Sequence, residues 1–127
     1  MSRHAFNPPG ETPPSPMYSF GASAEGWVHT SGIVAIDERG VTQHSGDARA
    51  QTDFVLCRIG KILAQRDCSF DDVVLAQIFL KSMSDYQDMN SAYATYFPSN
   101  APARFCISAG LVKDDWLVEI NVIAKAK

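Results

Sequence analysis

Two short segments near the C-terminus carry residues that could bind a small acid and activate water beside it. In residues 102–107, Arg104 and Cys106 alternate with apolar side chains. Successive side chains of a strand point to opposite faces, so this alternation predicts a strand with Arg104 and Cys106 on one face. Residues 117–120 predict a second strand, in which Glu119 stands between apolar neighbours.

We expect these two strands to pair as a hairpin around a turn at residues 112–115. In that register Arg104 lies opposite Glu119, and a cation, a thiol and a carboxylate line one patch of the sheet. A guanidinium matches a substrate carboxylate with two hydrogen bonds, and a carboxyl in an apolar setting could orient water or relay a proton. Taken by itself, the spacing favours a plainer interpretation of Arg104, in which it pairs with a neighbouring carboxylate such as Glu119. The plainer alternative for Glu119 is an outward-facing residue on an alternating strand.

Cys106 is the candidate nucleophile in this patch. A cysteine nucleophile needs a base or a lowered pKa, and the segment contains no histidine, while His29 is distant in the sequence. We therefore expect the backbone amide or carbonyl of Cys106 to contact a ligand, and its side chain to form part of a pocket wall. A buried apolar role is nearly as well supported.

The composition indicates one domain and argues against several classes of partner. The chain has 127 residues, of which 46% are hydrophobic and 20% charged, and this suits a single core. The formal net charge is -3 with no basic run, which does not indicate a nucleic-acid surface. No apolar segment approaches the ~20 residues of a membrane span, and the N-terminus lacks the pattern of a secretory signal.

The three cysteines and three histidines are scattered without the spacing of metal ligands. We therefore expect no metal site. An odd number of cysteines in a chain without a secretory signal predicts reduced thiols and a cytosolic protein.

Hydrophobic patterns divide the chain into a leader and one domain. Residues 1–16 hold five of the seven prolines and predict an extended, partly mobile leader before a domain at residues 17–127. The expected strands include 17–22, 27–31 and 73–80, and the expected helices run from 47 to about 66 and from 84 to 97. A Ser-x-x-Gln capping box at residues 84–87 opens the second helix, and the apolar run 73–80 indicates a central strand buried on both faces.

These elements predict an α+β fold with two helices packed on one face of a sheet. The other face would stay open and would need cover from another subunit. Its apolar positions, in one register or the other, include Val28, Val118, Ile120 and Val122. An aromatic stripe on the second helix is interpreted as packing and consists of Tyr86, Tyr93, Tyr96 and Phe97.

The order and spacing of several short motifs resemble one protein family, the reactive intermediate deaminases, also called the RidA or YjgF-like family. The motifs are Tyr18, Ser31-Gly32, Tyr96-Phe97-Pro98, Pro102-Ala103-Arg104-x-Cys106, Val118-Glu119-Ile120 and Ile123-Ala124. Residues 102–113 look especially like the aminoacrylate deaminase branch of that family. The chain departs from this branch at 108–109, at 115–116 and in its leader.

The resemblance implies a chorismate mutase-like, or YjgF-like, fold with a mixed sheet. It also implies a homotrimer in which three sheets form a central barrel, with active sites in clefts between subunits. The implied reaction hydrolyses small enamine or imine acids, such as 2-aminoacrylate or 3-aminoacrylate, to carbonyl acids and ammonia without a cofactor. Arg104 would bind the substrate carboxylate and Glu119 would position water. The residues implied to shape the cleft are Tyr18, Ser31, Gly32 and Cys106.

Three other functions stay open at this point. A deaminase for 2-aminomuconate or another longer enamine would need a second cation in the cleft, and the sequence identifies none. A non-catalytic or chaperone-like trimer could use the same pocket to bind small carboxylates. Ribonuclease activity has been attached to this family, but the net acidity of the chain argues against it.

Overall fold

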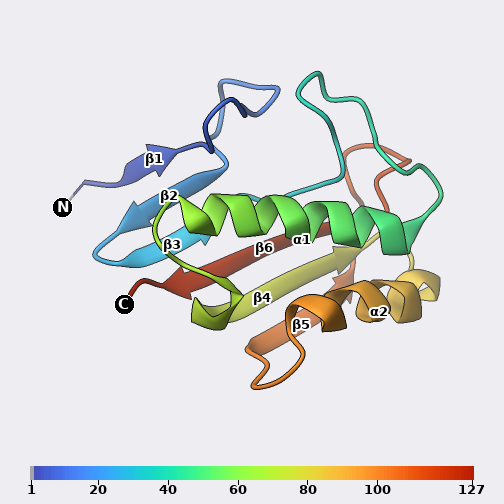
Figure 1. The fold of residues 1–127 in the computed structure, drawn as a ribbon. Helices are drawn as coiled ribbons and strands as arrows, with labels where there is room; N and C mark the ends of the chain where they lie inside the picture. The colour runs from blue at the N-terminus through green and yellow to red at the C-terminus, as the bar shows by residue number, and fades with distance from the viewer. Residues whose placement is uncertain (1) are drawn as a thin grey trace.

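Two helices, α1 (Ala48–Ala64) and α2 (Tyr86–Tyr96), lie on one face of a six-stranded sheet (Figure 1). The computed structural model describes residues 2–127. The strands are β1 (His4–Phe6), β2 (Gly21–Ala24), β3 (Trp27–Thr30), β4 (Val73–Leu80), β5 (Ala103–Ser108) and β6 (Val118–Lys125). Two short 3-10 helices, η1 (Phe70–Asp72) and η2 (Met83–Asp85), flank β4. This arrangement confirms the predicted α+β fold with two helices on one face of a mixed sheet.

The predicted hairpin of β5 and β6 is wrong, because β4 lies between these two strands. The strand order is β1-β2-β3-β6-β4-β5, and β4 pairs with β5 in parallel and with β6 antiparallel. Arg104 is in register with Ala76, while Glu119 is in register with Phe79. Nearness in sequence favoured a hairpin, but the long apolar strand β4 offers backbone hydrogen bonds along both of its edges and separates the pair.

This register places Arg104 and Glu119 on opposite faces of the sheet. Residues in register share a face, so Arg104 lies on the side of buried Ala76, which the helices cover. Glu119 lies with partly exposed Phe79 on the other side. Strand β4 is therefore buried on its helix face only, contrary to the prediction for residues 73–80, because residues 2–127 place both helices on one face and leave Val74 and Phe79 of the other face at least partly exposed.

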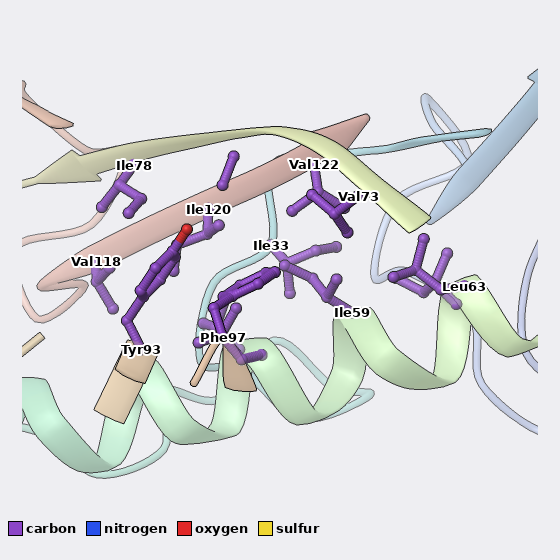
Figure 2. Packing of buried hydrophobic residues seen from close by; sticks show 14 of the residues in the cluster. Ile33, Ile59, Leu63, Val73, Ile78, Tyr93, Phe97, Val118, Ile120 and Val122 are labelled. Atoms are coloured by element: carbon purple, nitrogen blue, oxygen red, sulfur yellow. The ribbon is translucent and has the colours of Figure 1, made fainter. Parts of the chain in front are cut away.

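The core fills the space between the helices and the sheet. Figure 2 shows Ile59 and Leu63 of α1, and Tyr93 and Phe97 at the α2 side, pointing toward the strands. Each buried aliphatic side chain contributes about 1.5–3 kcal/mol to folding. The valines and isoleucine predicted for the open face lie here instead and are at most 1% exposed: Val28, Val118, Ile120 and Val122.

The two helices begin in different ways. The first helix begins close to the start expected at residue 47. Asp47 caps α1, and its carboxylate accepts the backbone N–H of Ala50 at 2.9 Å. The capping box predicted for the second helix is wrong. The 3-10 turn η2 takes up Ser84, whose backbone N–H donates to the Ser82 hydroxyl, and α2 starts only at Tyr86 without a side-chain cap.

The leader is tied to the domain, although the sequence did not predict a strand in it. Strand β1 pairs with β2, which begins later than the predicted strand at residues 17–22. Glu11 forms ion pairs with Arg58 at 3.3 Å and with Lys61 at 3.5 Å. Arg58 is 8% exposed and lies over the rings of Phe20 and Phe54, each 5.2 Å from its guanidinium carbon. The segment from 11 to 20 is therefore anchored on α1.

Among residues 2–127, no helix combines the length and apolar character that crossing a membrane requires.

Candidate active site

Strand β5 presents the Arg104 guanidinium beneath two tyrosines of α2. One terminal nitrogen of the guanidinium donates a hydrogen bond of 3.2 Å to the Tyr86 hydroxyl. The guanidinium carbon lies 4.7 Å from the centre of the Tyr93 ring and 5.8 Å from that of Tyr86. These cation–π contacts hold the cation in place. They do not neutralise its positive charge, as a carboxylate partner would.

Within the described part of the chain, no carboxylate forms an ion pair with Arg104. The plainer interpretation of the sequence, an Arg104–Glu119 pair, does not hold because the two side chains lie on opposite faces. A partly buried guanidinium of this kind is suited to an external carboxylate, which it can bind in a bidentate manner.

Arg104 and Cys106 line one open groove of about 500 Å³, together with Met83, Tyr86 and Phe105. Burial raises the pKa of the Cys106 thiol, and the nearby Arg104 charge opposes this rise only in part. The thiol is therefore protonated near neutral pH, which does not favour a nucleophilic role. We call Arg104, Cys106 and Tyr86, with the groove that they line, the arginine half-site.

Glu119 lies on the other face of the sheet, against Gly32. Strand β6 is held beside this glycine by two backbone hydrogen bonds between Ile33 and Ile120, of 2.8 and 3.1 Å. A methyl group on Gly32 would lie 2.9 Å from the carboxyl carbon of Glu119 and 3.2 Å from its Cγ. Burial raises the pKa of the Glu119 carboxyl, since the charged form loses hydration there.

Ser31 precedes Gly32 in the chain, and the Tyr18 phenol lies near enough to Glu119 to be affected by its charge. The Ser31 hydroxyl donates to the Ser19 carbonyl, and its backbone N–H donates to the Phe20 carbonyl at 2.9 Å. Both Tyr18 and Ser31 line a cavity of about 440 Å³. Burial raises the pKa of the Tyr18 phenol, while the Arg58 charge lowers it and the Glu119 charge raises it. We call Tyr18, Ser31, Gly32 and Glu119 the glutamate half-site.

The single patch predicted from the sequence is thus two half-sites of one chain. Arg104 and Cys106 share a face, as the alternation indicated, but the sheet separates them from Glu119. The Ser31 hydroxyl is bonded to the backbone of residue 19 rather than left free for a ligand.

Sequence reasoning missed the part that two tyrosines play at the arginine half-site. Tyr86 and Tyr93 were assigned to helix packing, which holds for Tyr93 at 6% exposure but not for Tyr86 at 37%. Their spacing of seven residues, two helical turns, puts them on one face of α2. Only the parallel pairing of β4 and β5 brings Arg104 under that face. The aromatic stripe of the helix does not by itself indicate that an arginine lies there.

Replacing Gly32 with alanine is expected to lower activity at this site by about 10²-fold, because the added methyl displaces the Glu119 carboxylate. Steady-state kinetics would measure the loss. The backbone at Gly32 does not require glycine by its φ angle, so we expect the fold to persist. Gly110→Ala is the matched control, since a methyl group there meets no atom within 4 Å. Equal activity in both variants would show that the Glu119 position does not matter.

Comparison with known proteins places the chain in a family. The family model described as Endoribonuclease L-PSP matches residues 10–126. The chain belongs to the YjgF/RidA family. This finding confirms the resemblance drawn from the motifs of the sequence.

Among curated relatives, the chain is 42% identical over 124 residues to a protein of Acinetobacter baylyi named 3-aminoacrylate deaminase RutC. The match covers 98% of each of the two chains. Among solved structures, the YjgF family member NMB1025 of Neisseria meningitidis is 31% identical, with a TM-score of 0.82 over 100% of this chain and 97% of its own. Yeast Mmf1 is 25% identical, with a TM-score of 0.89 over 99% of this chain and 100% of its own.

Proposed function

We propose that this chain hydrolyses small enamine and imine acids, such as 2-aminoacrylate or 3-aminoacrylate, to carbonyl acids and ammonia. The observation that carries the proposal is the Arg104 guanidinium, which is held by tyrosine rings in an open groove without a carboxylate partner in residues 2–127. The relative named 3-aminoacrylate deaminase supports the same class of substrate.

The working site, in this proposal, forms between two copies of the chain. Within one copy, the arginine and glutamate half-sites face opposite sides of the sheet and cannot act on one small molecule. Because a neighbour supplies a different surface from the one that receives it, the contact is heterologous, and such contacts give a closed ring when the rotation between neighbours closes. The open sheet face has exposed apolar side chains that a neighbour would cover: Trp27 at 41%, Phe105 at 40% and Ile107 at 47%. We propose a homotrimer with a central barrel, as the family resemblance implies.

The reaction that we propose needs an anchored acid, a protonated nitrogen and one water. Arg104 of one subunit binds the substrate carboxylate. The enamine takes a proton from solvent on carbon and becomes an iminium, whose carbon is electrophilic. An imine substrate gives the same iminium when its nitrogen is protonated. Glu119 of the neighbouring subunit accepts a proton from water as the new C–O bond forms, and passes it to the nitrogen of the carbinolamine. The C–N bond then breaks and ammonia leaves, while the carbinolamine hydroxyl releases its proton to solvent and becomes the carbonyl oxygen.

The raised pKa of Glu119 suits this exchange of protons. A carboxyl with an ordinary pKa is a weak base near neutral pH, and burial makes this one a stronger base. Tyr18, Ser31, Gly32 and Cys106 would form the walls of the shared cleft. The chemistry draws on no cofactor.

Ammonia release tests the proposal. A dehydratase or an amino-acid oxidase would generate the enamine or imine in the assay, with a chemical trap competing for it. We expect the protein to accelerate ammonia release over the uncatalysed rate. Binding of the product acid without acceleration, across short and long substrates, would favour the non-catalytic carboxylate-binding function instead.

RNA cleavage, which the description of the matching family names, has less support in this chain. The formal net charge is -3, and a surface that binds RNA gains most of its affinity from basic groups. Cleavage of RNA that persists in an Arg104→Ala variant would mean a different site or a contaminant.

We also propose a cytosolic location. All three cysteines, Cys57, Cys68 and Cys106, are free thiols, which agrees with a reducing compartment.

A further inference from the structure

We propose that the Tyr86 hydroxyl is a second carboxylate-binding group, which acts beside Arg104 on the same substrate oxygens. The inference rests on the proposed function in one respect only, namely that Arg104 binds the carboxylate of a small acid. It adds a residue that the motifs of the sequence do not include.

Tyr86 is placed to meet a ligand. It is the first residue of α2, its side chain is 37% exposed, and it lines the groove that also contains Arg104 and Cys106. A core tyrosine of the same helix, Tyr93, is 6% exposed and is not part of that groove lining. Its exposure and its place in the groove lining therefore distinguish Tyr86 from the packing residues of its helix.

The direction of the hydrogen bond decides what Tyr86 can do. The Arg104 guanidinium has donors only, so the Tyr86 oxygen accepts in the 3.2 Å bond between them. A phenol has one hydrogen of its own to donate, and within residues 2–127 the Tyr86 hydroxyl makes no other hydrogen bond. Its hydrogen is therefore available to an acceptor in the groove.

A carboxylate is the acceptor that fits both donors. When one oxygen or both oxygens of a carboxylate bind the guanidinium, the anion stands beside the phenol that the guanidinium already contacts. Two donors of different geometry then hold one anion. A neutral ligand such as an amide gains less from this arrangement, because hydrogen bonds to a charged acceptor are about twice as strong.

The test measures binding of pyruvate, the 2-oxo acid expected from 2-aminoacrylate, by isothermal titration calorimetry. We expect Tyr86→Phe, which keeps the ring and removes only the hydroxyl, to weaken pyruvate binding by about tenfold. Pyruvamide, the uncharged analogue, should lose much less. Turnover should show the same change as a higher KM with kcat nearly unchanged.

The matched control is Tyr96→Phe on the same helix. The Tyr96 hydroxyl donates to the Asp53 carboxylate at 2.8 Å and is not part of the groove lining, so its loss should leave pyruvate binding unchanged. A dissociation constant for Tyr86→Phe within about twofold of wild type would overturn the proposal. An equal loss of pyruvate and pyruvamide binding would also overturn it, because the hydroxyl would then not distinguish the charged ligand from the neutral one.

The test separates this inference from the proposed function. If the wild type binds pyruvate through Tyr86 but releases no ammonia, the deaminase function fails and the carboxylate-binding role of Tyr86 stands. If Arg104→Ala binds pyruvate as wild type does, the anchor assigned to Arg104 is wrong, and the inference for Tyr86 falls with it.

Discussion

Replacing Arg104 with alanine is expected to lower kcat/KM for ammonia release by at least about a hundredfold. The guanidinium would make two charge-assisted hydrogen bonds to the substrate carboxylate, and each is worth about 1.5–3 kcal/mol. Because the anchor also sets the position of the reacting carbon, kcat should fall together with binding. Steady-state kinetics with the enamine generated in the assay would measure both.

The loss should not come from unfolding. Arg104 is partly exposed on an edge strand and contributes cation–π contacts, which are worth about 0.5–1 kcal/mol at such sites. Thermal unfolding should therefore change by only a few degrees. Arg39→Ala, at an exposed position of the turn that Asp37 and Gly40 close, is the matched control and should keep full activity. Activity that survives the loss of Arg104 would remove the basis of the proposed function.

Replacing Glu119 with glutamine is expected to lower kcat by about 10²-fold or more, with a smaller effect on KM. Loss of a general base costs about 10²–10⁴-fold in rate, and the amide keeps the size of the side chain beside Gly32. Rapid-mixing or steady-state measurement of ammonia release would show the change. A variant that keeps kcat within a few-fold of wild type would mean that another group handles the water.

The pH dependence of activity should follow the same carboxyl. Burial raises the pKa of Glu119 above its ordinary value, so the base becomes protonated, and activity falls, at a higher pH than for an exposed glutamate. The acid side of the profile should disappear in Glu119→Gln.

The effect of the Glu119 carboxyl on the stability of the fold should change with pH in the opposite direction to its effect on activity. A carboxyl with a raised pKa in the folded state stabilises the fold relatively at low pH, and this contribution is lost as the pH rises through the folded pKa. Glu119→Gln should therefore be at least as stable as wild type near neutral pH. Thermal unfolding of the two proteins between acid and neutral pH would check this sign.

The sequence allowed the local structure of the site to be predicted, but not its assembly. The alternation in residues 102–107 correctly put Arg104 and Cys106 on one face, and the helix expected from residue 47 begins at Ala48. Both signals depend only on residues close in the chain. Residues close in the chain do not determine which strand pairs with β5. Strand β4, which lies about thirty residues earlier, pairs with β5 where a pairing with β6 was expected.

Longer-range contacts also explain the residues that the sequence analysis placed wrongly. Val118 and its neighbours in β6 alternate in a way that fits either face, and the helices settle which face is buried. Tyr86 carries no local mark of function, because its role depends on an arginine eighteen residues later that a parallel strand brings beneath it. Strand β1 stands just before the prolines of the leader, and its pairing with β2 decides its conformation.

The central claim is that one site takes Arg104 from one subunit and Glu119 from the next, and mixing two inactive variants tests it most directly. Arg104→Ala and Glu119→Gln would be unfolded together and refolded, or co-expressed with different affinity tags, and mixed trimers would be isolated and sized by light scattering. Every mixed trimer has one cleft of three that receives both native residues, so isolated mixed trimers should regain about a third of the wild-type activity, and the unsorted mixture from equal amounts about a quarter. Mixed trimers that stay as inactive as their parents would contradict the shared site.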